Sequence, residues 1–204
     1  MFKKVEHKKE RVKEIKVKTC TFTGHRPDKL YGYSLDNPKY QILAQELAKH
    51  LRWLIENEGV KRFISGGAIG YDTVAFFVVE QMKREYEGIE NILAVPFQNQ
   101  FIKWREVDKE RYFRMKAQAD EIVYVDTLEE YQTKNDTPIG DFSNAKMQRR
   151  NEYMVDNSNY MVALWNGDKK GGTYNCVKYV LKQSHYNRIA IMNPDTFELR
   201  YEPC

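Results

Sequence analysis

Hydrophobic and polar positions alternate between two kinds of segment along this chain. Runs rich in β-branched, aromatic or aliphatic residues predict strands at 19–23, 60–64, 92–96, 122–125, 159–165 and 188–192. Between these runs, apolar residues recur at helical spacing after Pro38, over 73–82, around 104–115, after Ser143 and around 177–181. Strands that alternate with helices predict an α/β fold, with a mostly parallel sheet of about six strands and helices on both faces.

Several of the predicted helices carry recognisable end signals. Asn37 and Pro38 form an N-cap followed by a proline at the first helical position, and Gly59 is placed to end that helix. Ser143 is a second candidate N-cap. The polar stretch before it, residues 126–143, predicts a long loop, and loops of this length are commonly functional or mobile.

The length of 204 residues suits one ordinary domain, and charge separates a short extension from it. Residues 1–18 contain eight Lys or Arg against three Glu, whereas residues 19–204 contain 25 basic and 26 acidic side chains. We therefore divide the chain into a basic N-terminal extension, 1–18, and a single domain, 19–204. The extension could hold an anionic surface or nucleic acid loosely, or could serve only as a solubilising segment.

Composition also bears on compartment and partners. The chain has no long apolar run, so we expect neither a membrane span nor a membrane partner, and its first residues lack the apolar core of a signal peptide. Cys20, Cys176 and Cys204 are scattered, which predicts a reducing, cytoplasmic location and no metal site. The near-neutral charge of residues 19–204 argues against a nucleic-acid partner, and a homo-oligomer stays open.

The strongest local motif is Ser65-Gly66-Gly67-Ala68-Ile69-Gly70-Tyr71-Asp72, which joins a predicted strand to a predicted helix. Glycines let backbone approach a ligand closely, and the N–H groups at a helix start suit a phosphate. The motif by itself predicts either a nucleotide-type binding loop or a tight turn that serves packing alone.

Two further loops follow predicted strands and would share the same rim of a parallel sheet. The first contains Thr23-Gly24-His25-Arg26, in which Arg26 could contact phosphate. The second runs from Trp165 to Thr173 and contains another Gly-Gly turn. His25 could act as acid or base or simply brace its turn, and Asp72 could cap the helix or accept a ribose hydroxyl. Trp104 and Trp165 could stack a base or belong to the core.

These motifs, taken in order, resemble the YpsA-like family of the SLOG superfamily, which groups Smf/DprA (DNA-processing protein A) with the Lonely Guy phosphoribohydrolases. The resemblance runs from about Thr19 to Asn193. The motifs that carry it are Thr23-Gly24-His25-Arg26-Pro27, Ser65 to Asp72, Pro96-Phe97 with Gln100 and Trp104, Arg150-Asn151, Met154-Val155-Asp156, Trp165-Asn166-Gly167 and Gly171-Gly172-Thr173.

The resemblance implies a Rossmann-like domain that binds a nucleotide or nucleotide-derived ligand, such as an ADP-ribose-like molecule or a cyclic-nucleotide signal. Its superfamily is associated with nucleotide sensing in bacterial stress and phage conflict, so a sensor or sequestering role with no required cofactor is expected. The implied ligand-binding residues are Thr23, Gly24, His25, Arg26, Pro27, Ser65, Gly66, Gly67, Ala68, Gly70, Asp72, Phe97, Gln100, Trp104, Arg150, Asn151, Trp165, Asn166, Gly167, Gly171, Gly172 and Thr173.

Two residues depart from the pattern of this family and bear on which reaction the protein could catalyse. Cys176 stands where the phosphoribohydrolases carry the glutamate that serves N-glycosidic cleavage, which argues against the same hydrolysis. Asn166 stands where close relatives usually have Asp. Hydrolysis of an N-glycosidic or phosphate bond, with His25 or Asp72 as catalytic candidates, remains the alternative to binding, and DprA-like binding of single-stranded DNA is a second alternative.

Overall fold

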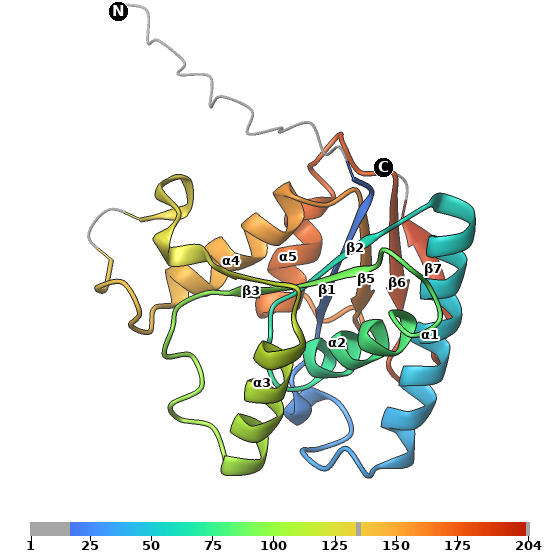
Figure 1. Ribbon diagram of the computed structural model, residues 1–204, viewed down its shortest axis with the longest axis horizontal. Coiled ribbons are helices and arrows are strands. Elements are labelled where there is room, and N and C mark those ends of the chain that lie inside the picture. The colour runs from blue at the N-terminus through green and yellow to red at the C-terminus, as the bar shows by residue number, and fades with distance from the viewer. Residues whose placement is uncertain (1–16, 134–135, 203–204) are drawn as a thin grey trace, which may run out of the picture.

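The computed structural model describes residues 17–133 and 136–202, and within them seven strands form one sheet in the order β4-β3-β2-β1-β5-β6-β7 (Figure 1). All neighbouring strands are parallel except β6 and β7. The predicted basic extension, 1–18, lies outside the described residues except for 17 and 18. The strands are β1 Thr19–Gly24, β2 Arg62–Ser65, β3 Glu90–Val95, β4 Glu121–Tyr124, β5 Tyr160–Leu164, β6 Arg188–Met192 and β7 Leu199–Glu202.

The strand order reverses beside β1. From β1 the chain moves outward through β2 and β3 to β4, and it then returns to pair β5 with the free side of β1. In register, Thr21 of β1 faces Ile64 of β2 on one side and Met161 of β5 on the other. A crevice opens beyond the carboxyl ends of two strands whose connections leave in opposite directions, and open α/β sheets bind ligands there.

Five helices cover the two faces of the sheet (Figure 1). Alternate side chains of β5 show the division: Tyr160, Val162 and Leu164 pack in one cluster with residues of α1 and α2, whereas Met161 and Ala163 pack with residues of α4 and α5. The third helix, α3, packs through Tyr112 and Met115 on the α2 side. The helices are α1 Pro38–Glu58, α2 Tyr71–Met82, α3 Glu106–Gln118, α4 Asn144–Asp156 and α5 Gly172–Val180.

The end signals read from the sequence act as predicted. The Asn37 side chain accepts a hydrogen bond from Lys39 N at 3.0 Å, and Gly59 ends α1 in the left-handed conformation with φ 70°. Ser143 Oγ accepts from Ala145 N at 3.1 Å at the start of α4. The α/β fold with a mostly parallel sheet is confirmed.

Three details differ from the prediction. The antiparallel strand β7 was not expected, because its residues are half-buried or exposed and its apolar and charged residues alternate over only four positions. Trp104 lies in turns before α3, not within that helix. The predicted 126–143 loop contains two short 3-10 turns, η2 Val125–Thr127 and η3 Glu129–Tyr131, which pack against α4. Within the described residues, no helix is long and apolar enough to cross a membrane.

His50 of α1 is buried and predicts a specific pH dependence of stability. Burial, together with the Arg188 charge, lowers the pKa of His50 from 6.5 to about 4, and its ring stacks on Trp53 at 6.1 Å. As the pH falls, His50 therefore takes up a proton at a higher pH in the unfolded chain than in the folded protein. The contribution of His50 to the free energy of unfolding is fully present above pH 6.5. It falls by about 3 kcal/mol as the pH drops towards 4. Denaturant unfolding of wild type and His50→Leu from pH 7.5 to 4 should show a flatter curve for the variant, and parallel curves would contradict this.

Candidate functional site

A cavity of about 660 Å³ lies at the carboxyl ends of β1 and β5, beside the point where strand order reverses. Its walls come from the turn after β1, the glycine loop after β2, helix α4 and the start of α5. The lining residues are Phe22, Thr23, Gly24, His25, Arg26, Asp28, Lys29, Ala68, Asp72, Phe142, Asn144, Met147, Gln148, Arg150, Asn151, Met154, Lys170, Gly171, Gly172, Thr173 and Asn175.

The turn after β1 is held in place by contacts with two other loops. A Cβ at Gly24 would lie 2.4 Å from the Tyr71 ring, so glycine is required for this close approach. The buried His25 places its Nε2 2.9 Å from Asn166 Oδ1, and Asp168 N–H donates to the same oxygen at 3.0 Å. Asn166 N also lies 3.4 Å from Nε2, so this ring nitrogen contacts both the side chain and the backbone of Asn166. His25 therefore braces the turn against the loop after β5.

The glycine loop after β2 is buried beneath Arg150. The Arg150 guanidinium donates from Nη1 to Gly66 O, and the same nitrogen lies 3.6 Å from Asp72 Oδ2. A Cβ at Gly66 would collide with this guanidinium. Asp72 Oδ2 also accepts from Ala68 N at 3.3 Å, so part of the predicted phosphate cradle is already bonded within the protein. Only Ala68 and Asp72 of this loop reach the cavity wall.

Burial shifts the pKa values of Asp72 and Arg150 in opposite directions. Burial raises the pKa of Asp72, and the nearby Arg150 and Arg26 charges partly oppose that rise. Burial likewise lowers the pKa of Arg150, which the Asp72 charge opposes and the Arg26 charge reinforces. Two guanidinium groups thus act on a single buried carboxylate.

The start of α5 is open towards the cavity. Gly171 is its N-cap with φ 89° and provides no side-chain cap, and no described residue accepts from the N–H groups of 172–174. A Cβ at Gly172 would meet nothing within 4 Å. Further along the helix, Cys176 is fully buried, and burial raises the pKa of its thiol to about 12. The thiol is therefore protonated at neutral pH and offers no replacement for the missing glutamate.

A second cavity of about 350 Å³ adjoins the first, and the two share Arg26, Phe142 and Met147. Three residues expected from the sequence, Phe97, Gln100 and Trp104, line it. Trp104 packs edge-on against Tyr112 with ring centroids 5.3 Å apart. It therefore belongs both to a core cluster and to a cavity wall. The remaining lining residues are Asn99, Ile102, Lys103 and Asp141.

The structure brings most of the expected residues to these two cavities. Thr23, Gly24, His25, Arg26, Ala68, Asp72, Arg150, Asn151, Gly171, Gly172 and Thr173 line the larger one. Eight expected residues lie outside both walls: Pro27, Ser65, Gly66, Gly67, Gly70, Trp165, Asn166 and Gly167. Gly67 faces Leu93 and Tyr112, and Trp165 donates from Nε1 to Asp168 O at 2.9 Å, so these two support the walls from behind.

The sequence reasoning found only part of the α4 side of the larger cavity. It expected Arg150 and Asn151 there, but it missed Asn144, Met147, Gln148 and Met154, which line the cavity from the same helix. These residues recur at helical spacing, so they lie on one face of α4. This spacing could have been recognised from the sequence. Lys170 and Asn175 flank the start of α5 and were also missed. Among the described residues, no cluster of three or more His, Cys, Asp or Glu side chains could hold a metal ion.

Comparisons with known proteins agree with this architecture. Residues 20–197 match the YpsA family model, described as the YspA SLOG family. The SPbeta prophage-derived protein YoqJ of Bacillus subtilis (strain 168) is 40% identical over 166 residues, which cover 81% of this chain and 96% of that protein. A UPF0398 protein of Bacillus pumilus (strain SAFR-032) is 28% identical over 185 residues, or 90% of this chain and 91% of the relative.

Among solved structures, DNA processing protein A (DprA) from Streptococcus pneumoniae is similar with a TM-score of 0.55 and 12% identity. The likeness covers 90% of this chain and 53% of that protein, and it shows a shared fold. The family match covers most of the chain, residues 20–197. The chain belongs to the YpsA family of SLOG proteins.

Proposed function

We propose that the larger cavity binds the phosphate of a nucleotide-derived small molecule and that the protein acts as a sensor or sequestering protein for it. The observation that carries this proposal is the uncapped start of α5, whose Gly171-Gly172 turn faces the same cavity as Arg26. Free N–H groups at a helix start, together with the positive end of the helix dipole, favour an anion.

The charge balance of the cavity supports an anionic ligand. Arg150 pairs with Asp72, and Lys29 pairs with Asp168 at 2.6 Å. Among the described lining residues, the side chains of Arg26, Lys170 and Asp28 have no hydrogen-bond or ion-pair partner, and four basic against two acidic side chains leave the lining with a net charge of +2. A bidentate guanidinium is well suited to phosphate oxygens. The cavity volume also falls within the usual range for small-molecule sites, about 300–1,000 Å³.

Binding is favoured over hydrolysis by the state of the catalytic candidates. Asp72 accepts from Ala68 N and faces Arg150, His25 Nε2 contacts Asn166, and Cys176 replaces the acid that phosphoribohydrolases use. Asp72 and His25 are therefore both already engaged within the protein. This choice is tested by incubating the protein with ADP-ribose, NAD, cyclic nucleotides and nucleoside monophosphates and assaying for free base or phosphate. Product release that Asp72→Asn abolishes would favour hydrolysis.

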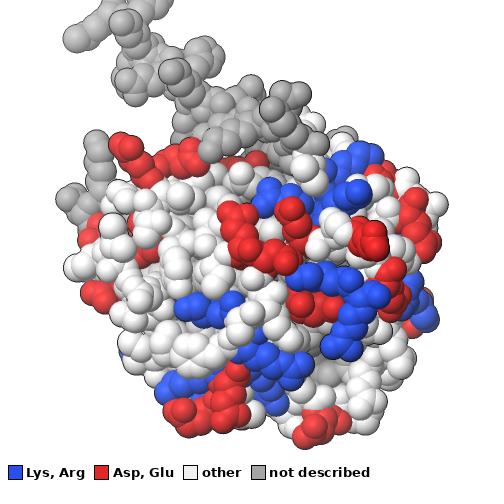
Figure 2. All heavy atoms as spheres, viewed as in Figure 1, with Lys and Arg blue, Asp and Glu red and all other residues white. Residues whose placement is uncertain are grey.

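Nucleic-acid binding, the alternative suggested by the fold shared with DprA, has less support. On the face drawn in Figure 2, basic and acidic side chains are intermixed and form no continuous basic surface. Nucleic-acid binding would show a steep dependence on salt. Deleting residues 1–18 without any change in DNA or RNA affinity would exclude the basic extension as its source.

The proposal predicts that Arg26→Gln weakens ligand binding by about 10- to 100-fold, because a hydrogen bond to a charged group contributes about 1.5–3 kcal/mol. Isothermal titration calorimetry against ADP-ribose, NAD, cyclic nucleotides and nucleoside monophosphates measures the affinity. Arg114→Gln is the matched control, since Arg114 lies over the Phe77 ring and lines neither cavity. If wild type binds, equal affinities for wild type and Arg26→Gln would remove Arg26 from the site.

A further inference from the structure

We propose that Phe142 determines the specificity of this site by covering a planar heteroaromatic ring, such as a nucleobase, bound in the smaller cavity. The inference rests on the proposed function, because it assumes that the ligand's phosphate lies in the larger cavity. Phe142 lines both cavities, and its side chain is 61% exposed. A large apolar side chain held in water beside two cavities suggests a surface that a ligand covers.

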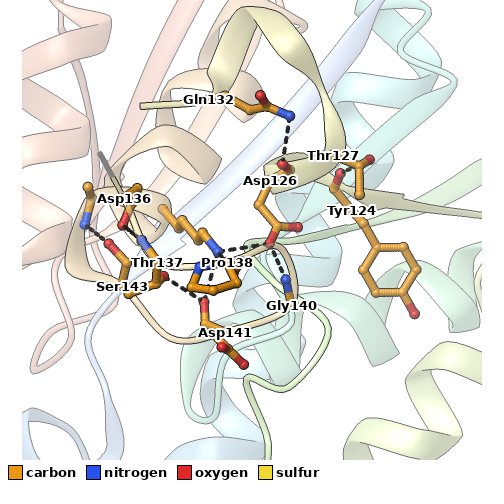
Figure 3. A network of polar contacts seen from close by, with 12 residues as sticks. Tyr124, Asp126, Thr127, Gln132, Asp136, Thr137, Pro138, Gly140, Asp141 and Ser143 are labelled. Atoms are coloured by element: carbon orange, nitrogen blue, oxygen red, sulfur yellow. Dashed lines mark hydrogen bonds and ion pairs between the residues drawn. The ribbon is translucent and has the colours of Figure 1, made fainter. Parts of the chain in front are cut away.

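The segment that carries Phe142 is anchored firmly at its base. Lys146 of α4 is buried, and its Nζ donates to Pro138 O at 2.6 Å and to Asp141 O at 3.0 Å. The same ammonium lies 3.2 Å from Asp126 Oδ2, which also accepts from Gly140 N at 2.8 Å. Figure 3 shows this network around Asp126, Pro138, Gly140 and Asp141.

A further bond ties this segment to the wall of the smaller cavity. Asn99 N donates to Gly140 O at 3.1 Å, and Asn99 itself lines that cavity. The Phe142 ring lies edge-on to the buried Phe97, with centroids 5.7 Å apart and an interplanar angle of 88°. The exposed ring is therefore positioned before any ligand arrives, which lowers the entropic cost of stacking against it.

The composition of the smaller cavity fits a planar ring with polar edges. Phe97 and Trp104 of the connection between β3 and α3, together with Phe142 of the segment before α4, supply aromatic surface. Asn99 and Gln100 supply amide groups that can pair with ring nitrogens and exocyclic groups. Arg26 stands at the junction of the two cavities, so one ligand can place its phosphate on one side of Arg26 and its ring on the other.

The test compares a ligand that has a base with one that lacks it. We would titrate AMP, ADP-ribose and ribose 5-phosphate into wild type, Phe142→Ala, Phe142→Tyr and Ile139→Ala. Ile139 is the matched control, because it is 64% exposed on the same segment and lines neither cavity of the site. Phe142 is exposed, so thermal unfolding of Phe142→Ala should match wild type.

We expect Phe142→Ala to lose roughly 5- to 100-fold in affinity for the base-bearing ligand, as for loss of one aromatic stacking partner. Affinity for ribose 5-phosphate should stay within twofold, and Phe142→Tyr, which keeps the ring, should restore nucleotide binding. If wild type binds a nucleotide and Phe142→Ala binds it equally well, or loses ribose 5-phosphate to the same extent, the inference is wrong while the proposed function stands. If wild type binds none of the three ligands, the inference is wrong, and titration of NAD and the cyclic nucleotides decides the proposed function.

Discussion

Replacing Arg150 by methionine is expected to destabilise the protein by about 3–5 kcal/mol, the usual cost of removing one partner from a buried ion pair. Arg150 and Asp72 are both buried, and the guanidinium also donates to Gly66 O. Its loss removes the ion-pair partner of the Asp72 carboxylate and leaves the Gly66 carbonyl without its donor. Denaturant unfolding at pH 7 measures the difference in the free energy of unfolding.

The pH dependence and a neighbouring residue provide controls for this prediction. Without Arg150, the pKa of Asp72 rises further, so the destabilisation should shrink as the pH falls and Asp72 takes up a proton. Arg149→Met on the same helix removes a half-buried partner of Glu152 and should cost less than about 1 kcal/mol. Adding Asp72→Asn to Arg150→Met should recover part of the loss. Equal effects of the two single arginine replacements would contradict the role assigned to Arg150.

The fold was predictable because the signals that specify it are local. The strands β3 and β5 are buried on both faces and contain continuous apolar runs, whereas β1 is recognised by its β-branched and aromatic residues. Helix ends follow from single residues such as Asn37, Gly59 and Ser143. The strand β7 was not predicted from the sequence, because it is short and polar and is defined by its antiparallel pairing with β6.

The site was predictable only in part, since several of its contacts join distant segments. The order of the loops placed Arg26 and Gly172 on one rim, and they do line one cavity. Nothing local to Arg150 indicates that it covers Gly66, which lies 84 residues away. Likewise, nothing in the sequence around Phe142 indicates that its exposed ring lies where the two cavities meet.

Gly172 offers the most direct probe of the central claim, that an anionic nucleotide-derived ligand binds at the start of α5. Its Cβ position is open and valine has a higher helix propensity than glycine, so Gly172→Val should fold normally. The valine side chain would stand at the open N–H groups of the first turn and keep a phosphate away. We expect an affinity loss of about 100-fold or more, because several charge-assisted hydrogen bonds are lost together.

The decisive measurement is calorimetric titration of the nucleotide panel into wild type, Gly172→Val and Lys178→Val. Lys178 is exposed on the same helix and lines neither cavity, so it controls for the added valine. The account predicts that wild type and Lys178→Val bind a phosphate-bearing nucleotide alike, while Gly172→Val keeps its melting temperature and loses the ligand. Wild-type binding that Gly172→Val leaves intact, or no binding across the panel, would contradict it.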